Sequence, residues 1–437
     1  MITWTTKTGH DKRIRQFHPW VFSNELDKSP KGIAPGTPVV LKDSNGIVLA
    51  KGYGNPNSLI SFRALSFGDL EQNPWGGDFI RQKLLDAWKT RNALGFEKSF
   101  RLCFGEGDHL PGLIIDRYLV DVETEKGTSR AQVFSLQILT AGMQVLMSNK
   151  TEILQAVAEE AMVQGISEVT WEKTAIVDRS DVQIRKLEGL DVPQPTQVKG
   201  LEGADLTKAD ILLEAFAGGA EIKMRCDLID GQKTGFFLDQ TQNIRQVINL
   251  LKSSRILKGK TKLRVLDLCC YVGHWSTQIA RYAQTIGLPV EVTLVDVSET
   301  ALAAAEINVT RENGAVNAIK GNVLEDLQKL PMSDFDLVIA DPPAFIKAKK
   351  DIPTGRHAYL KFNTQAFRLV RPGGLVVSCS CSGLFQESEF IEVVEKAIRR
   401  NELEAIRLLR GESAGDHPHL VSFPEGAYLK MFTHYLP

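Results

Sequence analysis

The chain has 437 residues, of which 43% are hydrophobic and 24% are charged, and its formal net charge is −1. This is the composition of a globular protein that is too long for one hydrophobic core, and roughly three domains are expected at about 150 residues each. The near-zero charge excludes a strongly basic protein, so nucleic-acid binding must depend on local basic patches. No run of about 18 uncharged apolar residues predicts a membrane span, and six cysteines without a disulfide framework favour a cytoplasmic location.

Residues 1–68 form the first expected domain, which is built from short strands and turns. Apolar runs at 38–41 and 47–50 flank Asn45-Gly46, a strong signal for a β-hairpin turn. Before the hairpin, basic side chains precede His18-Pro19-Trp20, and this mixture suits contact with RNA phosphates and stacking of bases. A solvated charged turn beside a core tryptophan is the alternative, and the segment alone leaves both open. The basic residues are Lys7, Lys12, Arg13 and Arg15.

The second expected domain, residues 75–200, mixes helix and strand signals. A turn-rich stretch at 73–77 precedes a helix predicted over 78–94, and strands are predicted at 113–115 and 169–171. Residues 190–203 contain Pro193 and Pro195 and therefore predict a linker or an exposed loop.

From residue 211 to 437 the pattern becomes a regular alternation of strands and helices. Such alternation is typical of a Rossmann-like, doubly wound α/β sheet. Ser298 is expected to cap its helix by accepting from the amide of Thr300 or Ala301. The expected strands are 264–268, 290–297, 318–323, 335–340 and 374–379, and the expected helices are 276–285, 298–313, 356–370 and 386–402.

Three of these strands end abruptly in polar or reactive residues. The run at 265–268 leads into Cys269-Cys270-Tyr271-Val272-Gly273, the run at 338–340 into Asp341-Pro342-Pro343, and the run at 376–379 into Ser380-Cys381-Ser382-Gly383. Continuous apolar runs are typical of parallel strands buried on both faces. Ligands of such sheets bind just beyond the carboxyl ends of the strands. The sequence therefore predicts a cofactor pocket beside a cysteine nucleophile.

The acids near the first strand end indicate which cofactor to expect. A dinucleotide fingerprint needs three spaced glycines, whereas this loop has only Gly273, and no phosphate-binding Gly-Lys-Ser/Thr loop is present. Asp296, at the end of the second strand, can accept from two ribose hydroxyls through its two carboxylate oxygens. Asp267, Gly273 and Asp296 together thus predict a nucleoside cofactor without phosphates, and S-adenosylmethionine is the expected one. No metal site is expected.

Asp341-Pro342-Pro343 and Cys381 predict the chemistry. Two prolines stiffen the loop and leave its carbonyls free to accept from the exocyclic amine of a planar base. In amino-group methyltransferases an aromatic residue follows the second proline directly, whereas Ala344 stands between here. A cysteine thiolate that adds to carbon 6 of a pyrimidine makes carbon 5 nucleophilic. Cys379, two residues before Cys381, is interpreted as a core residue.

These motifs resemble those of the RlmI-type bacterial ribosomal RNA cytosine-5 methyltransferases. The resemblance continues in the same order along nearly the whole chain. Further matching motifs are residues 18–22, 105–108 with 110–112, 178–181, 233–240 and 416–418. The resemblance implies a PUA RNA-binding domain, a central domain and a methyltransferase domain, with cytosine in 23S ribosomal RNA as the target. A homodimer is a further expectation that the sequence does not settle.

By this resemblance each matching residue acquires an expected role. Cys381 is the nucleophile and Asp341 holds the edge of the cytosine, while Pro342, Pro343 and Phe345 face the RNA. The family's Asp-Gln-Arg run reads Asp239-Gln240-Thr241, so the role of that arginine is in doubt here. The expected cofactor residues are Asp267, Tyr271, Gly273, Asp296, Asn322, which replaces an acid, and Gln240.

Two other functions are considered. One is an RNA methyltransferase that acts on a guanine ring nitrogen without a covalent adduct, and the other is a non-catalytic RNA-binding ribosome assembly factor. Cys381 argues against the first, and the acids at 267 and 296 argue against the second. The base that removes the proton from carbon 5 stays open, with Asp341 and the pair Asp416-His417 as candidates.

Overall fold

The computed structural model describes residues 2–68, 73–125, 127–219 and 221–437. Residues 69–72, between the first two expected domains, lie outside the described residues. The chain forms two compact units. The first comprises Met1–Ile211, Asp227–Leu238 and Gly415–Gly426, and the second comprises Leu212–Cys226, Asp239–Ala414 and Ala427–Pro437.

The first unit begins with a five-stranded sheet in the order β1-β3-β4-β5-β2. The predicted hairpin at Asn45-Gly46 is confirmed: Asp43 Oδ1 accepts from the amides of Asn45 and Ile47, and Gly46 has a φ of 86°. The elements are β1 (Ile2–Thr5), α1 (Lys12–Arg15), β2 (Trp20–Val21), β3 (Thr37–Lys42), β4 (Val48–Gly54) and β5 (Phe62–Phe67).

Within a second sheet, the strands β10-β9-β8-β7-β11 follow one another in this order, and β6 pairs with β7. Apolar side chains of α2 and α4 pack on it around Trp88 and Phe134, and the predicted helix at 78–94 is confirmed as α2. The elements are α2 (Gly77–Ala93), β6 (Phe100–Phe104), β7 (Leu113–Thr124), β8 (Gly127–Ile138), α3 (Ala141–Leu146), α4 (Lys150–Val163), β9 (Thr174–Asp178), β10 (Thr196–Lys199) and β11 (Ala209–Leu213).

Two expectations for this region are wrong. Residues 169–171 are not a strand, because Ser167 Oγ accepts from the amide of Val169 and a short 3-10 turn begins at Trp171, before β9. Residues 190–203 are not only a linker, because β10 lies within them and pairs antiparallel with β9. In both places local hydrogen bonds or a distant strand decide the structure, and a pattern in sequence does not show either.

The second unit contains a seven-stranded sheet in the order β15-β14-β13-β16-β17-β19-β18. Neighbours from β15 to β17 are parallel, whereas β19 pairs antiparallel with β17 and with β18. This confirms the doubly wound α/β fold. The strands are β13 (Leu263–Leu268), β14 (Val290–Asp296), β15 (Ala315–Lys320), β16 (Phe335–Ala340), β17 (Val370–Ser380), β18 (Ile406–Gly411) and β19 (Lys430–Tyr435), and β12 (Ile222–Cys226) precedes them.

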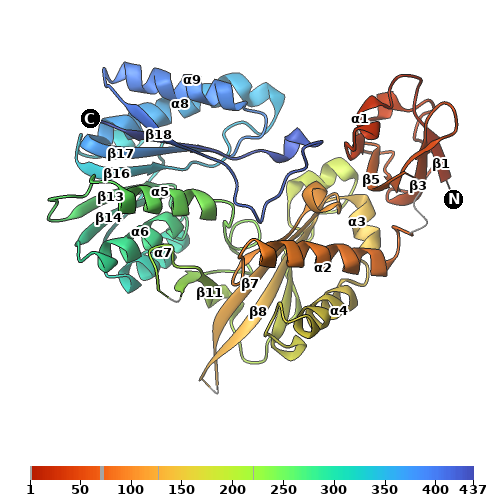
Figure 1. Cartoon of the computed structure of the whole chain (residues 1–437), viewed down its shortest axis with the longest axis horizontal. Helices are drawn as coiled ribbons and strands as arrows, with labels where there is room; N and C mark the ends of the chain where they lie inside the picture. Colours follow the sequence, from red (N-terminus) through yellow and green to blue (C-terminus); the bar gives the residue numbers. More distant parts are fainter. Residues whose placement is uncertain (1, 69–72, 126, 220) are drawn as a thin grey trace. The chain divides into compact units, whose positions relative to one another are not determined.

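Helices cover both faces of this sheet. In Figure 1, α5, α6 and α7 lie on one face, and α8 and α9 lie on the other. A separate hydrophobic cluster fills each layer, because the strands between them point apolar side chains both ways. The helices are α5 (Thr241–Ser253), α6 (His274–Thr285), α7 (Glu299–Arg311), α8 (Ile352–Leu369) and α9 (Glu387–Arg400).

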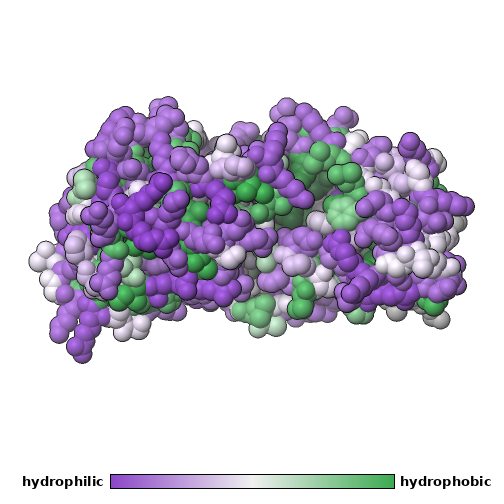
Figure 2. Space-filling model, turned by 90° about the horizontal axis from the view of Figure 1, so that it is seen from above, coloured by the Kyte–Doolittle hydropathy of each residue, from purple (hydrophilic) through white to green (hydrophobic). Residues whose placement is uncertain are grey.

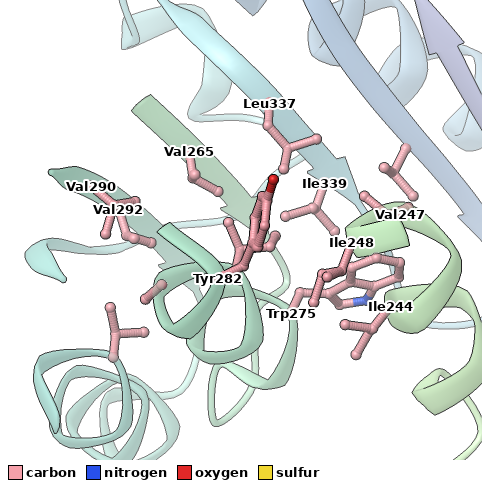
Figure 3. Close-up of a cluster of buried hydrophobic side chains, with 14 of the residues drawn as sticks. Ile244, Val247, Ile248, Val265, Trp275, Tyr282, Val290, Val292, Leu337 and Ile339 are labelled. Atoms are coloured by element: carbon pink, nitrogen blue, oxygen red, sulfur yellow. The ribbon is translucent and has the colours of Figure 1, made fainter. Parts of the chain in front are cut away.

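The hydrophobic cluster between α5, α6 and the sheet holds the first turn of α6 in place. Trp275, in the first turn of α6, is 5% exposed and belongs to one cluster with Ile244 and Ile248 of α5 and with Val265 and Ile339 of the central strands (Figure 3). Burial of such a large ring stabilises the fold by roughly 2–3 kcal/mol. It also fixes the indole nitrogen close to the carboxyl ends of the strands.

The predicted strand 318–323 ends earlier than expected, because β15 stops at Lys320. Asn322 turns the chain: its amide donates to Asp326 Oδ2 at 2.8 Å, and its Oδ1 accepts from the amide of Leu324 at 3.0 Å. The predicted cap of α7 is confirmed, since Ser298 Oγ accepts from the amide of Ala301 at 3.2 Å.

The surface drawn in Figure 2 is mostly hydrophilic, with smaller groups of hydrophobic residues among the hydrophilic ones. Among the described residues, no helix combines the length and the apolar character that crossing a lipid bilayer requires.

Candidate active site

Three loops that carry the predicted site residues follow neighbouring strands of the second unit. Leu268 of β13 is in register with Ala340 of β16, and Ala340 is in register with Ser378 of β17. The strands are parallel, so their carboxyl ends share one edge of the sheet. The predicted neighbourhood of the loops at 269–273, 341–343 and 381–383 is therefore confirmed.

The loop after β13 adopts an unusual backbone. Cys269 has a φ of 61°, Tyr271 of 49° and Gly273 of 79°, and the first two are strained for residues with side chains. A Cβ at Gly273 would lie 3.1 Å from the Cβ of Ala305, so glycine also permits the close approach of α7. Asp296 holds the loop in place, because its Oδ2 accepts from the amide of Tyr271 at 2.9 Å. Strain of this kind is characteristic of ligand-binding loops.

Asp267 presents a buried carboxylate that is only half satisfied. Its Oδ2 accepts from the hydroxyl of Ser276 at 2.6 Å, whereas Oδ1 has no hydrogen-bond partner among the described residues. Burial raises the pKa of Asp267 to about 7, and the charge of Asp296 acts in the same direction. A buried carboxylate with a free acceptor atom is costly unless a donor or a cation occupies the site. The residues therefore fit a ligand with a cationic amino group.

Asp341 receives two hydrogen bonds on one oxygen. Gln240, which directly precedes α5, donates from Nε2 at 2.9 Å, and Trp275 donates from Nε1 at 3.2 Å, both to Oδ2. Desolvation raises the pKa of Asp341 to about 7, and the charge of Asp239 adds to this, while the two hydrogen bonds oppose it. Gln240 also accepts from Asn243, so its amide contacts Asp341 and α5. Asp341 is thus oriented, and near neutral pH it can hold or release a proton.

Cys381 lies just beyond β17, next to the Asp-Pro-Pro loop. Its Sγ is 3.9 Å from the carbonyl oxygen of Pro342. The following residue is firmly held, because Ser382 Oγ accepts from the amide of Ile346 at 3.1 Å and lies 2.9 Å from the hydroxyl of Tyr359. The residue that follows the thiol is therefore held in place. Cys381 is partly exposed, as a nucleophile must be.

Cys379, by contrast, is a core residue. It is completely buried in the hydrophobic cluster with Val377 and Met431. Burial raises the pKa of its thiol well above the usual value, so the thiol stays protonated. The two cysteines differ in exposure as the sequence predicts.

Other predicted site residues are used differently from what the sequence suggests. The side-chain oxygen of Asn322 accepts a hydrogen bond from the amide of Leu324 within the turn described above. Phe345 is half-buried, and its ring packs edge-on against Tyr359 at 4.8 Å between centroids. Pro342 is buried and Pro343 is exposed. Of the three residues expected to face RNA here, only Pro343 presents itself freely to solvent.

The basic residues of the N-terminal segment lie on or near α1 in the first unit. Arg15 forms ion pairs with Asp11 and Asp43, and Arg13 forms one with Glu425 at 3.3 Å. Lys7 donates to the carbonyl oxygen of Asn24 at 2.8 Å, and Lys12 is exposed. The charge excess of this segment is therefore partly neutralised within the unit. The sequence could not show this, because Asp43 and Glu425 come from distant positions.

The pair Asp416 and His417 is buried in the first unit. Asp416 Oδ1 lies 2.8 Å from His417 Nδ1, and Oδ2 accepts from the amide of Arg101. Arg101 in turn forms a buried ion pair with Asp116 at 2.7 Å. At 2% exposure, His417 belongs to this network of charges. Because His417 is buried and paired with Asp416, we interpret it as a structural residue and not as a solvent-accessible base.

A basic loop that the sequence reasoning missed follows the Asp-Pro-Pro turn directly. Lys347, Lys349 and Lys350 are all exposed, and no ion pair of theirs occurs among the residues described in the structure. The acid of the same loop, Asp351, accepts from the amide of Ala348 and so is occupied in capping. The run Lys347-Ala348-Lys349-Lys350 was visible in the sequence as a signal. Trp275 was missed as well, because only the fold brings it to Asp341.

The fold and the site together define a Rossmann-like methyltransferase domain, and a small five-stranded sheet precedes it in the chain. Family models agree: a PUA-like domain matches residues 5–67, and a methyltransferase domain matches residues 260–419. Ribosomal RNA large subunit methyltransferase I of Pseudoalteromonas translucida is 32% identical over 97% of this chain and 96% of its own length, and that of Photobacterium profundum is 32% identical over 98% of both chains. The chain belongs to the ribosomal RNA large subunit methyltransferase I family, which confirms the resemblance seen in the motifs.

Solved structures agree with the fold. A protein from Streptococcus mutans, described as a candidate SAM-dependent methyltransferase, superposes with a TM-score of 0.69 over 99% of this chain and 100% of its own, at 19% identity. A second structure, described as a candidate methyltransferase complexed with SAH, superposes equally well, again with a TM-score of 0.69 at 19% identity. At this identity the likeness supports the fold.

Proposed function

We propose that this protein methylates carbon 5 of a cytosine in 23S ribosomal RNA, through a transient covalent bond between Cys381 and the base. The observation that carries the proposal is the proximity of Cys381 to the Asp341-Pro342-Pro343 loop, with Sγ 3.9 Å from the carbonyl oxygen of Pro342. Methylation of cytosine at carbon 5 needs two groups, a thiolate that adds to carbon 6 and an oriented carboxyl group at the edge of the base. Family membership supplies the class of substrate, ribosomal RNA of the large subunit.

S-adenosylmethionine is the proposed methyl donor, and when bound it supplies the methyl group. The half-satisfied carboxylate of Asp267 fits its cationic amino group. Asp296, at the end of the adjacent strand, keeps further lone pairs on its carboxylate oxygens for ribose hydroxyls. Gly273 and Tyr271 shape the loop between them. Asn322 and Gln240 are also proposed to line the cofactor site. Asn322 shapes the turn after β15, and Gln240 donates a hydrogen bond to Asp341.

The residues of this chain divide the chemistry between them. The thiolate of Cys381 adds to carbon 6, and the ring electrons then move towards N3, where a protonated Asp341 can donate. Carbon 5 becomes nucleophilic enough to take the methyl group. A base then removes the proton from carbon 5, and the bond between carbon 6 and sulfur breaks to release the thiolate. N3 returns its proton to Asp341, which restores the neutral aromatic ring. With a pKa of about 7, Asp341 can serve in either protonation state.

RNA binding is proposed to use two basic surfaces. One is the N-terminal segment with Lys7, Lys12, Arg13 and Arg15, of which Lys12 is the most available. The other is the loop with Lys347, Lys349 and Lys350, next to the reactive residues. Phosphates near the target nucleotide would contact the second surface.

Three further proposals concern the whole protein. They are a division into domains at 1–68, 75–200 and 211–437, a cytoplasmic location and a homodimer.

The alternative of guanine methylation needs no thiol, and a non-catalytic factor needs no methyl donor. The test is methylation of 23S ribosomal RNA by the purified protein, followed by nucleoside mass spectrometry. We expect 5-methylcytidine with wild type and with Cys379→Ala, and none with Cys381→Ala, while all three bind S-adenosylmethionine within a few-fold. A methylated guanosine as product, or equal loss in both cysteine variants, would contradict the proposal.

A further inference from the structure

A buried lysine lies against the turn that follows the proposed nucleophile. Lys430 is the first residue of β19 and is in register with Ser380 of β17, the residue before Cys381. Its side chain turns inward and the residue is 6% exposed. The ammonium donates at 2.7 Å to the carbonyl oxygen of Ser382 and at 2.7 Å to that of Phe385. It thereby closes the turn that begins directly after Cys381.

The charge of Lys430 is poorly compensated. No carboxylate of the described residues forms an ion pair with it: Glu387 and Glu389, which lie nearby, pair with Arg410 and Arg356. An ammonium has three N–H donors, and the two carbonyls use two of them. A buried cation without an anion is costly and is retained where it serves a purpose. An anion near this turn would therefore stabilise the buried ammonium of Lys430.

Cys381 is the group that can provide this anion. Burial lowers the pKa of Lys430 to about 8, and of the groups that oppose this decrease a negatively charged Cys381 would act most strongly. Three acids that also interact electrostatically with Cys381 are held in their neutral forms, because burial raises the pKa of each. They are the thiols of Cys269 and Cys379 and the phenol of Tyr359.

We propose that Lys430 is a positioning residue for the nucleophile: its ammonium holds the turn after Cys381 and favours the thiolate over the thiol. The proton of the thiol leaves to solvent, and the lysine stays protonated. This inference rests on the proposed role of Cys381. It differs from a purely structural role, because removal of the charge should change the reactivity of the thiol even when the fold is kept.

The test measures alkylation of Cys381 by iodoacetamide as a function of pH, with the modified peptide quantified by mass spectrometry. This readout needs neither RNA nor S-adenosylmethionine. The wild-type thiol should react half-maximally below the ordinary thiol pKa of about 8.5. In Lys430→Met the midpoint should rise by about one pH unit or more, so that alkylation at pH 7 is about tenfold slower. Lys430→Arg, which keeps the charge, should lie closer to wild type.

The matched control is Lys260→Met. Lys260 forms an ion pair with Asp336 at 2.6 Å, at the opposite edge of the same sheet. This variant should lose stability without any change in the alkylation midpoint. An unchanged midpoint in folded Lys430→Met would overturn the inference. If that variant does not fold, a wild-type midpoint at or above about 8.5 overturns it equally.

The proposed function can fail separately. If Cys381→Ala still produced 5-methylcytidine, Cys381 would not be the nucleophile, whatever the alkylation profile shows. If Cys381→Ala were inactive but the alkylation midpoint did not depend on Lys430, the proposed function would stand and the role of Lys430 would fall.

Discussion

The indole Nε1 of Trp275 donates a hydrogen bond to Oδ2 of Asp341 across 3.2 Å, and so the first turn of α6 contacts the loop after β16. Gln240 donates to the same oxygen, which leaves Oδ1 as the atom oriented away from these two donors. Trp275 is fixed by the core cluster of Figure 3. A core residue therefore aims a carboxyl group that we propose to contact the substrate.

Trp275→Phe should lower kcat roughly tenfold, or about 1.5 kcal/mol, the lower end for a hydrogen bond to a charged group. The phenylalanine keeps most of the packing. Because the lost bond holds the pKa of Asp341 down, this pKa should rise further above about 7, and the pH profile of kcat should shift to higher pH. The control is Tyr282→Phe on the same helix and in the same cluster. If the two variants had the same pH profile, the positioning role of Trp275 would be wrong.

Asp267→Asn should change how stability depends on pH. The folded-state pKa of Asp267 is raised to about 7, so the folded protein keeps a proton between pH 4 and 7 that the unfolded chain has lost. In wild type this group alone makes the free energy of unfolding fall by up to about 1.4 kcal/mol per pH unit over that range as pH rises. The difference between variant and wild type should therefore grow from pH 4 to pH 7. Urea unfolding at several pH values measures it, and parallel curves would refute the raised pKa.

Asp296→Ala should weaken binding of S-adenosylmethionine by about 1.5–3 kcal/mol, the range for a hydrogen bond to a charged group. The structure adds a second cause, since the variant also removes the hydrogen bond between the amide of Tyr271 and Asp296 in the strained loop. RNA affinity should be unchanged. Calorimetric titration gives both values. A cofactor affinity equal to that of wild type would exclude Asp296 from the proposed ribose contact.

Replacement of Lys347, Lys349 and Lys350 by glutamine should reduce the salt dependence of RNA binding. Three lost phosphate contacts should lower the slope of log K against log salt by roughly 2 for single-stranded RNA. The control is the double variant Lys262→Gln and Lys320→Gln, since these lysines pair with Glu291 and Glu299. Binding is measured by fluorescence anisotropy with a 23S fragment. Equal slopes for all three proteins would remove the loop from the RNA surface.

Much of the second unit could be predicted because its strands are buried on both faces. The strands β13, β16 and β17 carry apolar runs, and those runs end where the loops begin. The hairpin at Asn45-Gly46 followed from turn chemistry alone. The strand predicted at residues 169–171 was wrong, because the β-branched and aromatic residues there form local hydrogen bonds and do not pair with a neighbouring strand.

The rest depends on contacts between distant parts of the chain. Lys430 lies beside Ser380 only because β19 runs antiparallel to β17, against the parallel pattern of its neighbours. Likewise, residues 415–426 belong to the first unit although they lie within the methyltransferase part of the sequence. Neither periodicity nor spacing shows which strand a late segment will join. The identity of Cys381 was therefore predictable, whereas the surroundings that determine its reactivity were not.

The most direct measurement of the central claim is the covalent adduct itself. RNA that carries 5-fluorocytidine at the target position has no proton on carbon 5 to lose, so elimination of the thiol is blocked. Incubated with S-adenosylmethionine, wild type and Cys379→Ala should form a protein–RNA band that survives denaturing electrophoresis, with the RNA attached to the peptide containing Cys381. Cys381→Ala should form none. An adduct that persists in Cys381→Ala, or complete methylation of ordinary RNA by that variant, would contradict the account.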